Sequence, residues 1–114
     1  MNRLLDRFCR YARVFTQADE AAKTYPSSPG QLDLGRLLAD ELRRMGARDV
    51  EHDGHGIVWA TVPATVPHAA PAVAWIAHVD TSPETTGLNV KPQVHADYAG
   101  GQAGVPQSLA AWRL

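Results

Sequence analysis

The chain has 114 residues, of which 45% are hydrophobic and 20% are charged, and its formal net charge is −1. This length is that of one ordinary domain, and the composition is typical of a folded globular protein rather than a disordered segment. The 11 basic and 12 acidic residues are mixed along the chain. No basic stripe is present to neutralise phosphates, which argues against nucleic acid as a main partner.

The sequence also constrains which cross-links can form and where in the cell the protein is expected. Cys9 is the single cysteine, which excludes an intrachain disulfide and a structural zinc finger. We interpret it as a small residue at the core or boundary of a helix. The segment 1–10 lacks the apolar region of a signal peptide, and no apolar run approaches the ~20 residues that span a bilayer. We therefore expect a cytoplasmic protein without a membrane partner.

Apolar residues predict a first helix between Leu4 and Phe15. They recur at spacings of one, three and four, which places them on one helical face and leaves the arginines, among them Arg7 and Arg10, for the solvent side. Residues 19–28 break this periodicity and are predicted to form a loop.

A second helix has clear start and end signals. Ser28 is suited to the N-cap, Pro29 to the first helical position, and Gln31 to the partner position of a capping box. Gly46 fits the left-handed position that follows a helix. The apolar stripe between these ends consists of Leu34, Leu37, Leu38, Leu42 and Met45.

Short strands are predicted after the second helix. Residues 49–52 and 57–62 flank the turn-forming sequence 53–56 (DGHG), which favours a hairpin. Residues 72–79 are an almost unbroken apolar run, which predicts a strand buried on both faces of a covered sheet. The fold class is therefore α/β, with two N-terminal helices and a partial sheet.

The segment that carries candidate chemistry follows this last strand. His78 and Asp80 are two residues apart, so in an extended strand both side chains project to the same side. The imidazole can bind a metal ion, and the carboxylate can orient it. The His-x-Asp spacing alone is common by chance, and a lone histidine at a strand end is more commonly a hydrogen-bonded boundary residue than a metal ligand.

The surrounding residues point to a family. The segment 76–83 (IAHVDTSP) resembles the segment around the first zinc ligand of the peptidase T family of tripeptide aminopeptidases. Further segments similar to this family occur in the same order: 4–8 (LLDRF), 25–31 (YPSSPGQ), 38–42 (LADEL) with 45–46 (MG), 60–67 (ATVPATVP), 87–94 (GLNVKPQV) and 98–101 (YAGG).

The resemblance implies a role for each residue of the pair. His78 corresponds to a zinc ligand and Asp80 to the carboxylate that the family counts as catalytic. Full-length members are zinc metallopeptidases, hydrolases that use two zinc ions and a general-base glutamate to release the N-terminal residue of small peptides. Their catalytic domain is a three-layer α/β/α structure, and residues 1–101 correspond to its N-terminal part.

The sequence departs from the family after residue 101. Residues 102–114 are interpreted as a divergent or truncated tail, and the family's other zinc ligands lie beyond the matched region. His52 and His55 flank a predicted turn, His68 lies among prolines and His95 lies in an extended stretch. All four are expected to be polar surface residues.

We therefore expect an N-terminal fragment that binds zinc at most weakly and is inactive alone. The alternatives are a non-catalytic α/β interaction module, a subunit that complements another chain, or an unstable remnant that aggregates through the edge of strand 72–79.

Overall fold

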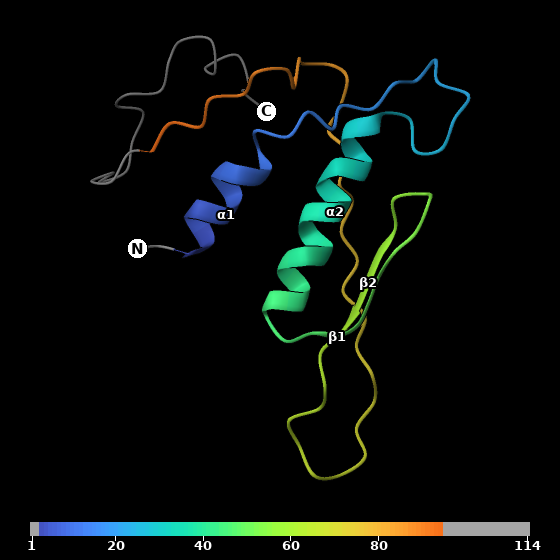
Figure 1. Cartoon of the computed structure of the whole chain (residues 1–114), viewed down its shortest axis with the longest axis vertical. Coiled ribbons are helices and arrows are strands. Elements are labelled where there is room, and N and C mark those ends of the chain that lie inside the picture. Colours follow the sequence, from blue (N-terminus) through green and yellow to red (C-terminus); the bar gives the residue numbers. More distant parts are fainter. Residues whose placement is uncertain (1–2, 95–114) are drawn as a thin grey trace, which may run out of the picture.

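The computed structural model describes residues 3–94, and Figure 1 shows how its elements are arranged. In chain order they are α1 (Arg3–Tyr11), α2 (Pro29–Arg44), β1 (Arg48–His52) and β2 (Val58–Thr61). Two helices and a two-stranded antiparallel sheet confirm the predicted partial α/β unit. The boundary at residue 101, the tail 102–114 and His95 lie outside the described residues.

The first helix is shorter than predicted, and it presents a different face to the rest of the chain. It ends at Tyr11, whereas the apolar pattern continued to Phe15. Leu4 and Phe8, which were predicted to face the core, are exposed. No residue of α1 is buried. Apolar packing within residues 3–94 therefore does not set the orientation of this helix.

A carboxylate on α2 orients α1 instead. Glu41, whose side chain is only 9% exposed, forms ion pairs with Arg10 and, at 3.5 Å, with Arg7 Nε. The Tyr11 hydroxyl donates to the same carboxylate, and burial together with this hydrogen bond raises the pKa of Tyr11. Arg10 is exposed as predicted and still pairs with Glu41, whereas Arg7, also predicted to face solvent, is only partly exposed. A largely buried carboxylate is unfavourable without partners, so the polar groups of α1 turn towards it.

The start of α2 was predicted at the correct residue but with the wrong hydrogen bonds. Ser28 is the N-cap with an extended backbone, yet its side chain makes no capping hydrogen bond. The Gln31 amide donates to the Thr16 carbonyl at 3.3 Å and to the Ser27 hydroxyl at 3.0 Å. Gln31 is buried, so its amide needs partners and finds them in the chain leading into the helix.

The end of α2 agrees with the sequence-based prediction. Gly46 has a φ of +85°, the left-handed conformation that glycine adopts without strain. The Ala47 amide then donates to the Leu42 carbonyl at 3.0 Å, which satisfies one of the last carbonyls of the helix.

The buried face of α2 packs on the hairpin. Leu34, Gly35 and Ala39 are buried, and the His52 ring of β1 lies so close to Gly35 that an added Cβ would come within 2.5 Å of its Nε2. His52 Nε2 is buried and has no hydrogen-bond partner among the described residues. The expectation of a surface role for His52 was therefore wrong. Its position on β1 turns it towards the helix, and glycine leaves room for the ring.

The hairpin itself forms as predicted. Glu51 pairs with Trp59 and His52 with Val58, and the register is irregular between Arg48 and Glu51. Asp49 lies within this irregular stretch at a φ of +50°, a conformation that aspartate tolerates better than most residues.

Asp53 organises the turn between β1 and β2. Its carboxylate accepts hydrogen bonds from the backbone amides of His55 at 2.9 Å and Ile57 at 2.8 Å. The bond from Ile57 is the largest influence that lowers the pKa of Asp53, with further contributions from His55. The sequence DGHG thus forms a turn in which the Asp53 carboxylate accepts hydrogen bonds from backbone amides of the turn.

The predicted buried strand over residues 72–79 is not formed within residues 3–94. The segment is extended but belongs to no strand, and Trp75 and Ile76 are 94% and 95% exposed. A strand buried on both faces requires neighbouring strands and covering layers. The described residues supply only the β1–β2 hairpin, which does not pair with this segment. No helix within residues 3–94 is long and apolar enough to cross a membrane.

Replacing Gly30 with alanine is expected to destabilise the junction between the two helices. A Cβ at this position would lie 1.7 Å from the Phe15 carbonyl oxygen, which is a backbone atom. We expect Gly30→Ala to lower the free energy of unfolding by about 1–3 kcal/mol, as measured by urea denaturation. Gly54→Ala is the matched control, because nothing lies within 4 Å of its added Cβ. Equal stabilities of the two variants would contradict the close approach.

Candidate functional site

The predicted pair of site residues lies together on the surface. His78 Nδ1 is 3.2 Å from Asp80 Oδ1 and 2.9 Å from the Asp80 carbonyl oxygen. The side chains of His78 and Asp80 are 82% and 45% exposed. The structure therefore brings the imidazole and the carboxylate to the same side of the chain and leaves both open to solvent.

This contact determines the tautomer of a neutral His78. Both atoms that face Nδ1, the carboxylate oxygen and the carbonyl oxygen, are acceptors, so Nδ1 must carry the proton. The lone pair of the neutral ring is then on Nε2. A histidine whose Nδ1–H donates to a carboxylate and whose Nε2 is free is the usual arrangement of a metal-binding imidazole.

The segment after the pair is held by the connection between α1 and α2. Thr81 forms a parallel bridge with Gln17. The Ala18 amide donates to the Thr81 carbonyl at 2.9 Å, and the Thr81 amide donates to the Thr16 carbonyl at 3.3 Å. Thr16 is buried, so these bonds attach the end of the candidate site to a fixed part of the fold.

Gln17 makes a second contact with the same loop. Its side-chain carbonyl accepts a hydrogen bond from the Gly87 amide at 2.9 Å. Together with the Thr81 bridge, this bond closes the loop 81–87 at both ends. Sequence reasoning missed Gln17, because the contact joins residues 70 positions apart and no local pattern signals it.

The other described histidines do not join this pair. His55 lies 3.7 Å from Asp53 in the hairpin turn and contacts the Tyr25 ring, while His68 is exposed, as predicted. His52 packs against α2. Across residues 3–94, no group of three or more His, Cys, Asp or Glu side chains could hold a metal ion. The described part of the chain thus brings together one histidine and one carboxylate, and no larger group of candidate metal ligands.

Known proteins resemble this chain over most of its length. No family model matches it. It is 46% identical over 100 residues to Peptidase T of Halothermothrix orenii, a match that covers 88% of this chain and 24% of that protein. Peptidase T of Bacillus cereus and that of Bacillus thuringiensis are each 40% identical over 106 residues, covering 93% of this chain and 26% of the relative.

These similarities make the chain a homologue of peptidases. The relatives are named Peptidase T, so the family resemblance inferred from the motif is confirmed. A match of 100 residues in a chain of 114 necessarily includes segment 76–83. The chain spans about a quarter of the length of the curated relatives that it matches.

Removing the Gln17 side-chain amide is expected to loosen loop 81–87. Gln17→Ala deletes the acceptor of the Gly87 amide but keeps the backbone bridge to Thr81. Since one such hydrogen bond is worth about 1 kcal/mol, hydrogen exchange at Gly87 should become roughly fivefold faster. Gln93→Ala is the control, because Gln93 is exposed and outside the loop. Unchanged exchange at Gly87 in Gln17→Ala would show that the side chain does not hold this loop.

Proposed function

We propose that this chain supplies one zinc ligand, His78, and one catalytic carboxylate, Asp80, to the active site of an aminopeptidase of the peptidase T type. The single observation that supports the proposal is the contact of His78 Nδ1 with Asp80, which leaves Nε2 free. It occurs within a region that is 40–46% identical to proteins named Peptidase T.

The chemistry of the pair fits zinc. A neutral imidazole is a common zinc ligand, and a carboxylate on its other nitrogen fixes the ring and raises its basicity. When bound, zinc supplies Lewis acidity that activates a water and polarises the scissile carbonyl. The part played by this chain is to keep the His78 ring oriented through Asp80, while Thr81 anchors the segment to residues 16–18.

The proposed substrates are small peptides with a free amino end. This follows from the family resemblance, in which two zinc ions act at one site and the N-terminal residue of a tripeptide is released. A cytoplasmic location belongs to the same proposal. Residues 3–94 contain no group of three candidate metal ligands. The remaining zinc ligands would therefore come from polypeptide outside this range.

A second candidate function is that of a complementing subunit without activity of its own. The exposed apolar run around Val73, Trp75 and Ile76 favours it, because large contiguous apolar surfaces mark contact sites for other polypeptides. The two candidates are compatible if the second polypeptide carries the missing ligands.

The isolated 114-residue chain is expected to show no peptidase turnover with zinc and a tripeptide. Catalytic zinc sites use about three protein ligands, and the described residues present no such group. The measurement is the release of the N-terminal amino acid from the tripeptide. Full-length Peptidase T of Halothermothrix orenii is the positive control. Turnover at a rate comparable with the control would refute this expectation.

Zinc contact with the isolated chain is expected to depend on His78. In a zinc titration followed by NMR, the His78 ring signals should shift, and His78→Ala should abolish the weak binding. Asp80→Asn should weaken it by roughly 10- to 100-fold, since it removes the carboxylate that orients the ring. His68→Ala is the control, because His68 is an exposed histidine outside the pair. Equal losses in His68→Ala and His78→Ala would contradict the assignment.

A further inference from the structure

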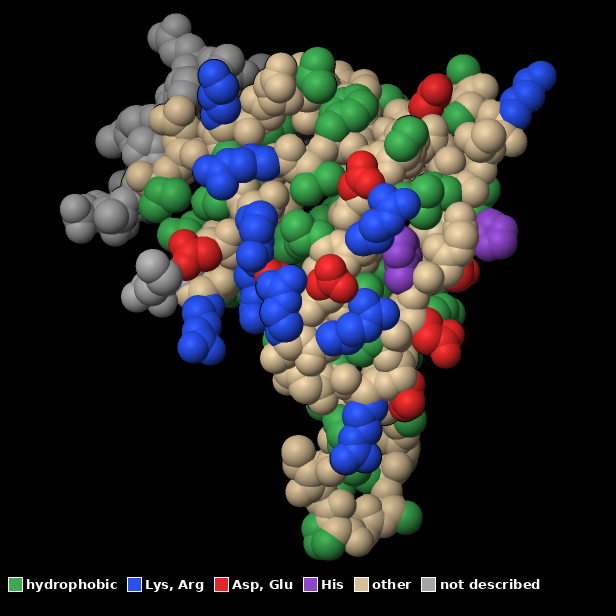
Figure 2. All heavy atoms as spheres, in the orientation of Figure 1, with side chains coloured by type: hydrophobic (Ala, Val, Ile, Leu, Met, Phe, Trp, Pro, Cys, Tyr) green, Lys and Arg blue, Asp and Glu red, His purple; other side chains and the backbone are tan. Residues whose placement is uncertain are grey.

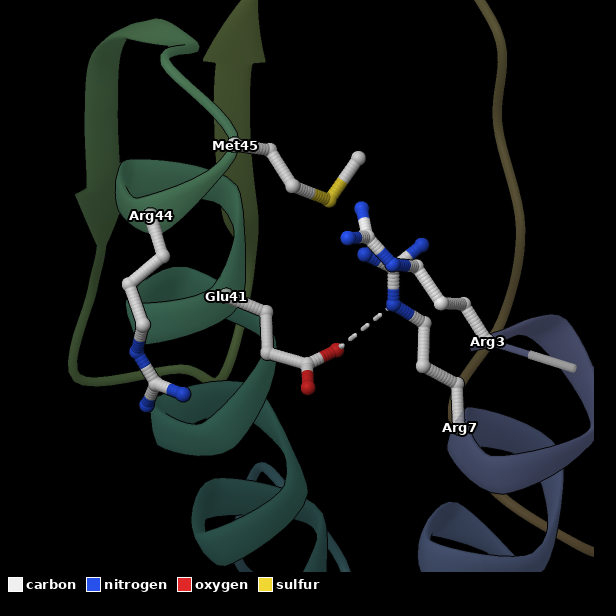
Figure 3. A pocket seen from close by; sticks show the side chains of 5 residues that line it. All are labelled: Arg3, Arg7, Glu41, Arg44 and Met45. Atoms are coloured by element: carbon white, nitrogen blue, oxygen red, sulfur yellow. Dashed lines mark ion pairs between the residues drawn. The ribbon is translucent and has the colours of Figure 1, made fainter. Parts of the chain in front are cut away.

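A pocket lies between α1 and α2, away from segment 76–83. Its volume is about 620 Å³, and Figure 3 shows the side chains that line it. Arg3 and Arg7 project from α1, Glu41 and Arg44 from α2, and Met45 follows the end of α2. Of the five described residues that line the pocket, four are charged and Met45 is apolar.

Positive charge exceeds negative charge in this pocket. Three guanidinium groups face one carboxylate, which gives the lining residues a net charge of +2. Glu41 already pairs with Arg7 and with Arg10, which adds a further positive charge beside the pocket. Within residues 3–94, Arg3 and Arg44 take part in no ion pair, although both line the pocket.

The two aspartates of α2 do not neutralise this charge. Asp33 and Asp40 on α2 pair with Arg36 and Arg43, at 2.5 and 3.1 Å, and neither aspartate lines the pocket. Figure 2 shows Lys and Arg side chains gathered over the face formed by the two helices. The whole chain has a net charge of −1, so this local excess is a property of the site and not of the composition.

We propose that this pocket binds a small phosphate-type anion with at least two negative charges, such as pyrophosphate. Guanidinium groups match phosphate oxygens with paired hydrogen bonds, and several of them around one anion give both geometry and charge. A monovalent anion would leave the net charge of +2 only partly compensated. Among the lining residues that the structure describes, Met45 is the one with an apolar side chain.

The test is calorimetric titration of the 114-residue chain with sodium pyrophosphate, with inorganic phosphate and citrate in parallel. Pyrophosphate should bind saturably and more tightly than phosphate. Citrate has comparable charge but only carboxylates, and the assignment to phosphates requires that it bind more weakly than pyrophosphate. Binding of citrate as tight as that of pyrophosphate would overturn the assignment to phosphates.

Variants locate the binding to this pocket. Arg44→Gln should weaken pyrophosphate binding about tenfold, because it removes a charge-assisted hydrogen-bond donor. Arg36→Gln is the matched control, since it removes the same charge from the same helix outside the pocket, and it should change affinity less than twofold. Arg3→Gln provides a second pocket variant if Arg44→Gln does not fold. No saturable binding at millimolar pyrophosphate, or equal losses in pocket and control variants, would overturn the proposal.

Discussion

The placement of α1 depends on one buried carboxylate. Glu41 forms ion pairs with Arg7 and Arg10 and accepts a hydrogen bond from Tyr11. All three belong to α1, which has no buried residue. Polar contacts of this kind are directional, so they fix how α1 is rotated more strongly than they stabilise it. The same carboxylate determines that arginines lie between the helices and that Leu4 and Phe8 lie on the exposed side. Much of the charge distribution on this face follows from Glu41.

A second constraint connects the helical part of the chain to the candidate site. The buried residue Thr16 accepts hydrogen bonds from Gln31, at the start of α2, and from Thr81, directly after the His78–Asp80 pair. The linker between the helices is thus shared by two parts of the molecule that are distant in sequence. The side chains of His78 and Asp80 are exposed, so the hydrogen bonds of the adjacent Thr81 are what attach their segment to this linker.

Sequence reasoning succeeded where local chemistry decides the structure. Pro29 and Gly46 marked the ends of α2, and the sequence DGHG marked the hairpin, because capping, left-handed φ and turn formation act over a few residues. The His78–Asp80 contact also follows from a two-residue spacing. Long-range effects could not be predicted in this way. The rotation of α1 towards Glu41 and the role of Gln17 depend on residues 30 or more positions away. The prediction that residues 72–79 are buried was wrong. An apolar run shows that burial would be favourable, but it does not show which strands or helices would cover it.

The exposed apolar segment 72–79 offers a surface for which two kinds of contact would compete. Its extended backbone and apolar side chains, among them Trp75 and Ile76, can be covered by a complementary polypeptide or by another copy of the same segment. A net charge of −1 provides almost no electrostatic repulsion between copies. Both contacts would use the same apolar side chains, so each would exclude the other.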